Sequence, residues 1–417
     1  MSESKQSLHD RACAYHENPT PGKIKIVITK PAETADDLTL AYSPGVAEPV
    51  REIADNPDNA YRFTGKGNSV AIISNGTAIL GLGALGPLAS KPVMEGKALL
   101  FNRFAGINAI DIEVNNKSVE DFITTVECIA DTFGGINLED IKAPECFTIE
   151  RELIKRCKVP VFHDDQHGTA IVTTAGILNA VELQGKKIEN CKVICVGAGA
   201  AGVACSQFLL DCGARKENFF MIDRHGVIRS DRPQYNNGEK PRFINDAGPK
   251  TLSEAINGAD ILLGVSGPGL VSEDDVKSMA PNAIIFACSN PDPEVDPEVV
   301  HRLRPDIIMG TGRSDYPNQI NNVLCFPFLF RGALDVRATA INLEMKQAAM
   351  EALRALAHEP VPAEVVKASG VGHLEYGREY LIPKPMDPRL LERVPKAVAQ
   401  AAVKSGVAQI PLPDKYK

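Results

Sequence analysis

Residues 192–210 read KVICVGAGAAGVACSQFLL, and this stretch decides the fold of the second half of the chain. A short apolar strand runs into the sequence GAGAAG, which opens an apolar helix. In a dinucleotide-binding turn, the first two glycines of G-x-G-x-x-G allow a tight turn and close approach of a pyrophosphate, and the third allows close helix–strand packing. The helix N-terminus adds free N–H groups and a positive dipole. The predicted cofactor contacts of this turn are Gly197, Ala198, Gly199, Ala200, Ala201 and Gly202.

A ligand-free glycine-rich turn is the alternative, but the position between a strand and a helix favours a dinucleotide site. Asp223 ends the next predicted strand, 21 residues after Gly202. An acid at this place favours the free ribose 2′-hydroxyl of NAD, whereas a neighbouring arginine accommodates the 2′-phosphate of NADP. Because Arg224 follows Asp223, the spacing leaves the choice between NAD and NADP open.

Short apolar runs alternate with amphipathic stretches along the rest of the chain, which is typical of α/β proteins. The expected strands are 69–74, 107–114, 134–138, 159–163, 192–197, 219–223, 259–266, 283–289 and 306–312, and the expected helices include 119–132, 146–157, 168–184 and 388–407. We predict an N-terminal α/β domain over residues 1–165. Residues 166–417 are predicted to form a doubly wound, Rossmann-type parallel sheet with C-terminal helices. The helix 168–184 would tie the two sheets together.

The composition excludes several classes of protein. The 417 residues contain 45 Lys and Arg against 53 Asp and Glu, a net charge of −8, which argues against a nucleic-acid partner. No apolar run approaches the 18 residues of a membrane span, and the polar N-terminus lacks the apolar stretch of a secretory signal. The ten cysteines include no C-x-x-C pair, so we expect free, buried thiols in a cytoplasmic protein.

Two acidic pairs follow predicted strands: Glu139 with Asp140, and Asp164 with Asp165. Ligands bind at the carboxyl ends of parallel strands, and four carboxylates gathered there would repel one another unless a cation joined them. Oxygen ligands of this kind suit Mg²⁺ or Mn²⁺. The alternative is that each pair caps the helix that follows. The sequence therefore predicts a divalent cation site, with helix capping left open.

His163 and His167 flank the second pair with a spacing that resembles half of a zinc motif. That motif requires a continuous helix, whereas here a strand precedes and Gly168 follows. We therefore expect hydrogen bonds around the acidic pair rather than zinc.

Residues 74–86 form a glycine-rich stretch that approaches another part of the molecule closely, because it contains too many glycines for a regular helix. Lys97 begins an apolar run soon after it and is a candidate for a desolvated lysine of lowered pKa that accepts a proton. A solvent-facing lysine is the alternative. Two roles are also possible for Tyr42: it is either a buried phenol or a proton donor.

Taken together, the motifs AYSPGVA, SNGTAILGLGALG, KPVMEGK, GGINLEDI, FHDDQHGTA, VGAGAAG, SNP and NQINN resemble those of the malic enzymes. The resemblance covers about residues 15–410 and is nearest to the bacterial NADP-dependent form, whose larger members carry a phosphotransacetylase-like domain. This chain ends at Lys417, so we do not expect that domain in it. The resemblance also implies a homodimer or a larger homo-oligomer.

The resemblance implies a role for each candidate residue. Tyr42 would be the general acid, Lys97 the general base, and Asp164 a proton-handling carboxylate close behind the metal. The implied metal ligands are Glu139, Asp140 and Asp165. The implied cofactor contacts, beyond the turn and Asp223 with Arg224, are Ile79, Leu80, Gly81, Leu82, Gly83, Gly86, Asn290 and Asn322, of which Asn290 and Asn322 would also face malate.

The implied reaction is oxidation of (S)-malate with NADP⁺, followed by loss of CO₂ to give pyruvate, with oxaloacetate decarboxylation as a further activity. One departure concerns Ala78, which stands where the long eukaryotic form carries an arginine for a substrate carboxylate, so the partner of the malate C4 carboxylate is open. Alternatives are an NAD-dependent or malolactic-type enzyme, a non-catalytic dinucleotide sensor, and a metal-dependent hydrolase. Without the resemblance, the residues predict a metal-assisted, dinucleotide-dependent dehydrogenase.

Overall fold

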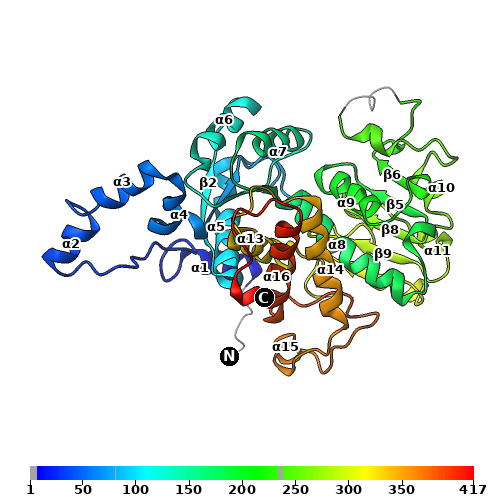
Figure 1. Ribbon diagram of the computed structural model, residues 1–417. Helices are drawn as coiled ribbons and strands as arrows, with labels where there is room; N and C mark the ends of the chain where they lie inside the picture. Colours follow the sequence, from blue (N-terminus) through cyan, green and yellow to red (C-terminus); the bar gives the residue numbers. More distant parts are fainter. Residues whose placement is uncertain (1–6, 80, 233–237) are drawn as a thin grey trace.

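The computed structural model describes residues 7–79, 81–232 and 238–417, in which two β-sheets lie side by side and are flanked by helices (Figure 1). The strands are β1 (Ser69–Ser74), β2 (Asn108–Glu113), β3 (Gly135–Leu138), β4 (Val161–His163), β5 (Val193–Val196), β6 (Phe219–Asp223), β7 (Gly226–Val227), β8 (Ile261–Gly264), β9 (Ile284–Ala287) and β10 (Ile308–Thr311). The helices are α1 (Leu8–Glu17), α2 (Ala35–Ala41), α3 (Ala47–Asp55), α4 (Ala60–Phe63), α5 (Pro87–Ala105), α6 (Val119–Ala130), α7 (Glu145–Arg156), α8 (Asp164–Leu183), α9 (Ala200–Asp211), α10 (Leu252–Ile256), α11 (Glu273–Ser278), α12 (Pro297–Leu303), α13 (Phe326–Asp335), α14 (Leu343–His358), α15 (Ala363–Ala368) and α16 (Arg389–Lys404).

The first sheet has the order β2-β1-β3-β4 and is entirely parallel. Successive side chains of a strand point to opposite faces, so Val70 and Ile72 of β1 join one apolar cluster while Ala71 and Ile73 join another. Helix α5 covers the first face, and α6 and α7 cover the second. The carboxyl ends of β1, β3 and β4 therefore meet at one edge.

The second sheet has the order β10-β9-β8-β5-β6-β7, parallel except for the short β7. The strand order reverses at β5, which confirms the predicted doubly wound, Rossmann-type sheet. The turn at residues 197–202 follows β5 and opens α9 beside this switch point, where ligands bind in such sheets.

Helix α8 joins the two sheets and is buried along most of its length. The predicted start at residue 168 was late, because the helix begins at Asp164. Carboxylates in a first turn interact favourably with the positive end of the helix dipole. The helix begins directly after β4 for this reason, and Gly168 lies inside it.

The last part of the chain returns to the first sheet. Phe330 of α13 contacts Phe101 of α5 and Phe162 of β4, with ring centroids 5.4 and 5.8 Å apart. Helix α16, predicted over 388–407, packs against α13 and α14. One apolar cluster thus runs through both sheets, although the domain division at residue 165 itself stays a prediction.

Most of the N-terminal arm, residues 7–55, projects from this core, although Lys23 bonds Pro92 and Glu95 of α5. Helices α1, α2 and α3 contain no buried residue, and Figure 1 shows α2 and α3 standing away from the body. Its extended segment exposes apolar side chains such as Ile26, which is 98% exposed, and Ile28. Arrays of exposed apolar residues of this kind mark interaction surfaces.

Two sequence expectations about the chain as a whole can be compared with the structure. All ten cysteines are free thiols as predicted, although Cys13 and Cys128 are exposed rather than buried. Within the described ranges, no helix combines the length and the apolar character needed to cross a membrane.

Candidate functional site

The two acidic pairs meet at the carboxyl edge of the first sheet. Glu139, Asp140 and Asp165 each place a carboxylate oxygen within 4.8 Å of the others. The backbone N–H of Asp140 donates to Asp165 Oδ2 over 2.7 Å, which ties the segment after β3 to the start of α8. The capping alternative does not hold for Glu139 and Asp140, because the next helix begins only at Glu145.

Lys97 of α5 reaches into the same cluster. Its Nζ lies 2.5 Å from Asp164 Oδ2 and 2.9 Å from Glu139 Oε1, and 4.1 Å from the ring centroid of Phe326. The lysine is nearly buried, so the solvent-facing alternative is excluded. One ammonium group is therefore paired with two carboxylates, and the charge of a third, Asp165, also acts on it.

The charges of this cluster correct the expected pKa of Lys97. Burial alone would lower the pKa of Lys97, but the charges of Asp164, Glu139 and Asp165 outweigh it and hold the pKa above its ordinary value. Burial raises the pKa of Glu139 to about 7 and that of Asp164 to about 6, although Lys97 opposes both. The expectation of a lowered lysine pKa was wrong, because the effect of the neighbouring acids on Lys97 could not be judged from the sequence.

The glycine-rich stretch lies against the acidic site. The backbone N–H groups of Thr77 and Ala78 donate to the carbonyl of Asp140, at 3.1 and 3.0 Å. Gly76 has φ +62°, and a Cβ on it would meet the Gly86 carbonyl at 2.2 Å, so this close approach requires glycine. The stretch therefore fixes the backbone of one candidate metal ligand.

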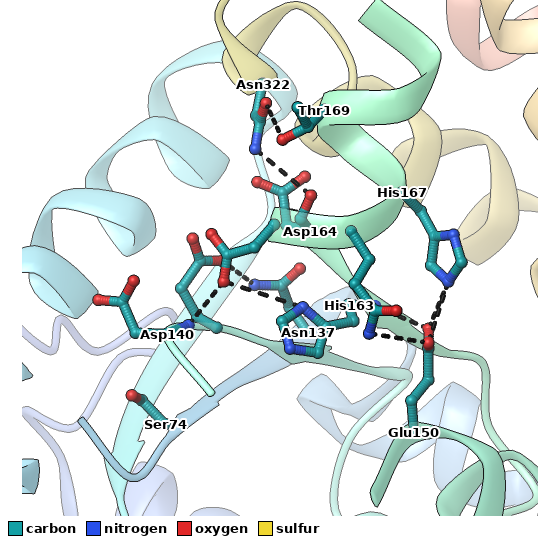
Figure 2. A network of polar contacts seen from close by, with 12 residues as sticks. Ser74, Asn137, Asp140, Glu150, His163, Asp164, His167, Thr169 and Asn322 are labelled. Atoms are coloured by element: carbon teal, nitrogen blue, oxygen red, sulfur yellow. Dashed lines mark hydrogen bonds and ion pairs between the residues drawn. The ribbon is translucent and has the colours of Figure 1, made fainter. Parts of the chain in front are cut away.

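The second sheet contributes to the site through two asparagines. Asn322 donates from Nδ2 to the Asp164 carbonyl over 3.3 Å and accepts from Thr169 Oγ1 (Figure 2). A Cβ on Gly81 would lie 2.7 Å from the carbonyl oxygen of Asn290, which follows β9. Gly81 and the segment that follows β9 are thus in contact.

The other predicted cofactor residues of the glycine-rich stretch differ in their exposure to solvent and in their backbone conformation. Ile79 is buried, Leu82 is exposed, and Gly83 and Gly86 have positive φ; Leu80 lies outside the described residues.

The dinucleotide turn has the close packing that its sequence predicts. A Cβ on Gly202 would lie 2.0 Å from the carbonyl oxygen of Gly197, and Gly197 itself has φ +123°. Helix α9 begins at Ala200, so its first N–H groups face the turn. This geometry fits a pyrophosphate at the helix N-terminus.

The end of β6 holds an acid surrounded by cations. Arg232 and Lys240 lie 3.3 and 3.8 Å from the carboxylate oxygens of Asp223. Arg224 is exposed beside them, and its Nε donates to His225. The negative charge of Asp223 is therefore balanced by basic groups.

The chain is similar to known proteins along most of its length. Residues 21–154 match the description "Malic enzyme, N-terminal domain", and residues 166–367 match "Malic enzyme, NAD binding domain". The NADP-dependent malic enzyme of Halomonas elongata is 62% identical over 97% of this chain and 96% of its own length. This chain belongs to the malic enzyme family.

Other members extend the comparison. The NADP-dependent malic enzyme of Salmonella typhimurium is 53% identical over 98% of this chain, which spans only 54% of that relative. A relative named NAD-dependent malic enzyme, from Rhizobium meliloti, is 49% identical. The crystal structure of malic enzyme from Pyrococcus horikoshii has a TM-score of 0.89 and 41% identity, and covers 97% of this chain and 93% of its own.

Tyr42 lies apart from the predicted base, Lys97, in this malic enzyme. It ends α2 on the arm and is 77% exposed, and no described contact joins it to Lys97. The buried-phenol alternative is therefore excluded, but the structure does not bring the expected acid to the expected base within one chain.

The sequence did not predict the role of Glu150. This buried acid of α7 accepts from the backbone N–H of His163 at 3.1 Å, from Gln166 Nε2 at 3.2 Å, and bonds the ring of His167 at 3.0 Å (Figure 2). Burial tends to raise its pKa, but His167, Lys346 and His163 lower it to about 2. His167 therefore forms its hydrogen bond beside the acidic pair, to Glu150.

A signal for Glu150 was present in the sequence. It falls on the apolar stripe of α7 formed by Cys146, Ile149 and Leu153, where a charged residue requires a partner.

Proposed function

We propose that this malic enzyme converts (S)-malate to pyruvate and CO₂ with NADP⁺ and a divalent cation, and that oxaloacetate decarboxylation accompanies this activity. The observation that carries the proposal is the cluster of Lys97 with the acidic pairs, placed where the glycine-rich stretch meets the end of β9. A substrate bound there would lie between the acids of the first sheet and the dinucleotide turn of the second.

Glu139, Asp140 and Asp165 would hold the cation. They supply three hard oxygen ligands from two segments, which suits Mg²⁺ or Mn²⁺ and leaves positions for substrate. When bound, such a cation stabilises the negative charge that develops on the C2 oxygen as CO₂ leaves, an effect worth several kcal/mol. Asn137 supports the set, because its side chain donates to Glu139 Oε2 over 2.9 Å.

Lys97 would take the proton of the C2 hydroxyl as the hydride passes to the nicotinamide. A cation shared by Glu139 and Asp165 would weaken the attraction that now raises the pKa of Lys97, and its own positive charge would lower that pKa further. Asp164, 2.5 Å from Nζ, would then share the proton. Asn322 and Thr169 hold Asp164 in place for this role.

NADP rather than NAD is supported by the basic groups at the end of β6. Arg232 and Lys240 balance the charge of Asp223, and exposed Arg224 adds a further cation where a 2′-phosphate would lie. Arg224→Ala should raise the KM for NADP⁺ at least tenfold and leave that for NAD⁺ within about twofold. An equal change in both KM values would refute this assignment.

Tyr42 requires a second copy of the chain if it is the general acid, because its own arm stands away from its own Lys97. We propose a homodimer, or a larger assembly, in which the arm of one chain lies on the other. The exposed apolar side chains of the arm, including Ile26, Ile28, Leu38 and Leu40, support a protein partner of this kind.

Mixing two inactive variants tests this assembly. Tyr42→Phe and Lys97→Ala homo-oligomers should each be inactive, and co-refolding them should restore part of the activity if the acid and base come from different chains. No recovery in verified hetero-oligomers would contradict a shared site.

Initial rates test the function itself. With malate, NADP⁺ and Mn²⁺ the enzyme should release CO₂ and form NADPH, and a chelator should abolish turnover. Lys97→Ala should abolish turnover yet leave NADP⁺ binding intact. Formation of lactate without NADPH would instead identify a malolactic enzyme. Binding of the cofactor without turnover would identify a dinucleotide sensor, and hydrolysis that needs no cofactor would identify a hydrolase.

We also propose a cytoplasmic location, which the ten free cysteines support.

A further inference from the structure

The ring of the buried His163 makes no hydrogen bond of ordinary geometry. The residue is 0% exposed, and neither ring nitrogen has an acceptor or donor at ordinary hydrogen-bond distance and angle in the part of the chain that the structure describes, although the backbone of Ile141 lies near enough to interact with the ring. Buried polar groups are normally hydrogen-bonded, and each exception requires an explanation. An imidazole carries at least one N–H in either charge state, so at least one buried donor is poorly satisfied here.

The ring of His163 faces the acidic site. Its Nδ1 lies 3.8 Å from Oδ2 of Asp165, beyond hydrogen-bond distance, and Figure 2 draws this contact as a dashed line from the ring. Asp165 Oδ2 already accepts from the backbone N–H of Asp140. A second donor on this oxygen would turn the other oxygen, Oδ1, toward the remaining ligands.

The backbone beneath the ring is held firmly. Glu150 accepts from the N–H of His163 and bonds His167 one turn further along α8. These bonds hold the backbone of His163 and the ring of His167 in place. The distance between Asp165 Oδ2 and His163 Nδ1 would therefore be shortened by a movement of the Asp165 side chain rather than of the histidine. Donors of this kind orient carboxylate ligands of metals in proteins.

We propose that His163 is a positioning residue of the cation site, which donates from Nδ1 to Oδ2 of Asp165 and leaves Oδ1 for the cation. This inference rests on the proposed function, since it takes Asp165 to be a ligand. It assigns His163 no contact with substrate, cofactor or reacting atoms.

Three substitutions separate this role from simple space filling. In His163→Asn the amide nitrogen replaces Nδ1, in His163→Gln it replaces Nε2, and His163→Leu fills the space without a donor. If the ring only fills the core, leucine should be tolerated or stabilising, because it removes an unpaired polar group.

The measurement is Mn²⁺ binding without substrate, followed by the electron paramagnetic resonance signal of free Mn²⁺. We expect the Kd to rise about 10- to 100-fold in His163→Leu and His163→Gln and to stay within about threefold in His163→Asn. The Kd for NADP⁺ and the far-UV circular dichroism should not change in any of the three, which verifies folding.

Two outcomes would overturn the proposal. Wild-type affinity for Mn²⁺ in His163→Leu, or equal loss in the asparagine and glutamine variants of normal fold, would show that Nδ1 does not position Asp165. Absence of Mn²⁺ binding to the wild-type protein would instead overturn the cation site itself, and His163 with it. If His163→Leu fails to fold, the comparison of asparagine with glutamine still decides.

Discussion

Replacement of Glu150 by glutamine should destabilise the protein, because the carboxylate of Glu150, on α7, forms hydrogen bonds with residues at the start of α8. Both of its oxygens accept hydrogen bonds, one from the backbone of His163 and the other from Gln166, and both lie near the ring of His167. Glutamine keeps the size and shape of the side chain but turns one acceptor into a donor. A donor then faces a donor in the buried turn.

The magnitude follows from two routes. The fall of the Glu150 pKa from an ordinary 4.5 to about 2 corresponds to roughly 3 kcal/mol of stability at neutral pH, at about 1.4 kcal/mol per pH unit. Loss of one buried hydrogen bond to a charged group costs about 1.5–3 kcal/mol. Because Gln166 can turn its own amide to relieve part of the conflict, we expect a loss of about 2–3 kcal/mol.

The loss should depend on pH in a defined direction. Since the folded-state pKa of Glu150 lies below its ordinary value, its contribution is complete above about pH 5 and declines as the pH falls through 4.5 toward 2. Urea unfolding followed by circular dichroism at pH 7.5, 5.5, 4.0 and 3.0 should therefore show a constant difference between wild type and Glu150→Gln at the first two values. The difference should shrink at the last two.

Glu152→Gln is the matched control, because Glu152 lies on the same helix and pairs with Lys155 at the surface. It should leave the free energy of unfolding nearly unchanged, because exposed ion pairs contribute little to stability. A Glu150→Gln variant that is as stable as this control at pH 7.5, or whose loss of stability grows on acidification, would contradict this role of Glu150.

Three further outcomes follow from the same structure. Phe101→Ala should lower the free energy of unfolding by about 3–5 kcal/mol in urea titrations, since the ring is fully buried against two phenylalanines of α13; a loss below 1 kcal/mol would contradict its place in the core. Gly202→Ala should weaken NADP⁺ binding at least tenfold by fluorescence titration, because its Cβ would lie 2.0 Å from the Gly197 carbonyl; unchanged affinity would argue against a close-packed turn. Mn²⁺ at 100 times its Kd should stabilise the protein by about 2.7 kcal/mol, and Asp165→Ala should remove that gain; a gain that persists in Asp165→Ala would contradict the ligand set.

The strands were predictable because their signal is local. The runs 69–74 and 219–223 coincide with β1 and β6, and the strand–turn–helix at 192–210 has the geometry that its glycines predict. Each of these segments contains its whole pattern within a few neighbouring residues. The start of α8 was misplaced by four residues, because residues 164–167 were left between the predicted strand 159–163 and the predicted helix, although Asp164 and Asp165 suit a first helical turn.

The candidate site was predictable only as a set of residue types. The two acidic pairs meet because parallel strands bring their carboxyl ends to one edge, a rule that the sequence pattern can use. The partners of Glu150 could not be anticipated, since its three donors follow it by more than ten residues across a strand connection. The lack of a well-formed hydrogen bond at the ring of His163 could not be anticipated either, because it depends on the positions of all the groups around the ring.

The α/β class, the dinucleotide turn and the family follow from residues that are adjacent in the chain. The charge of Lys97 and the distance of Tyr42 from it depend instead on how the chain folds. Ionisation depends on burial and on charges a few ångströms away, which α5, β3 and α8 supply from distant parts of the chain. The position of Tyr42 depends on the direction of the N-terminal arm, which extends away from the acidic cluster of the same chain, and no local sequence pattern predicts that direction.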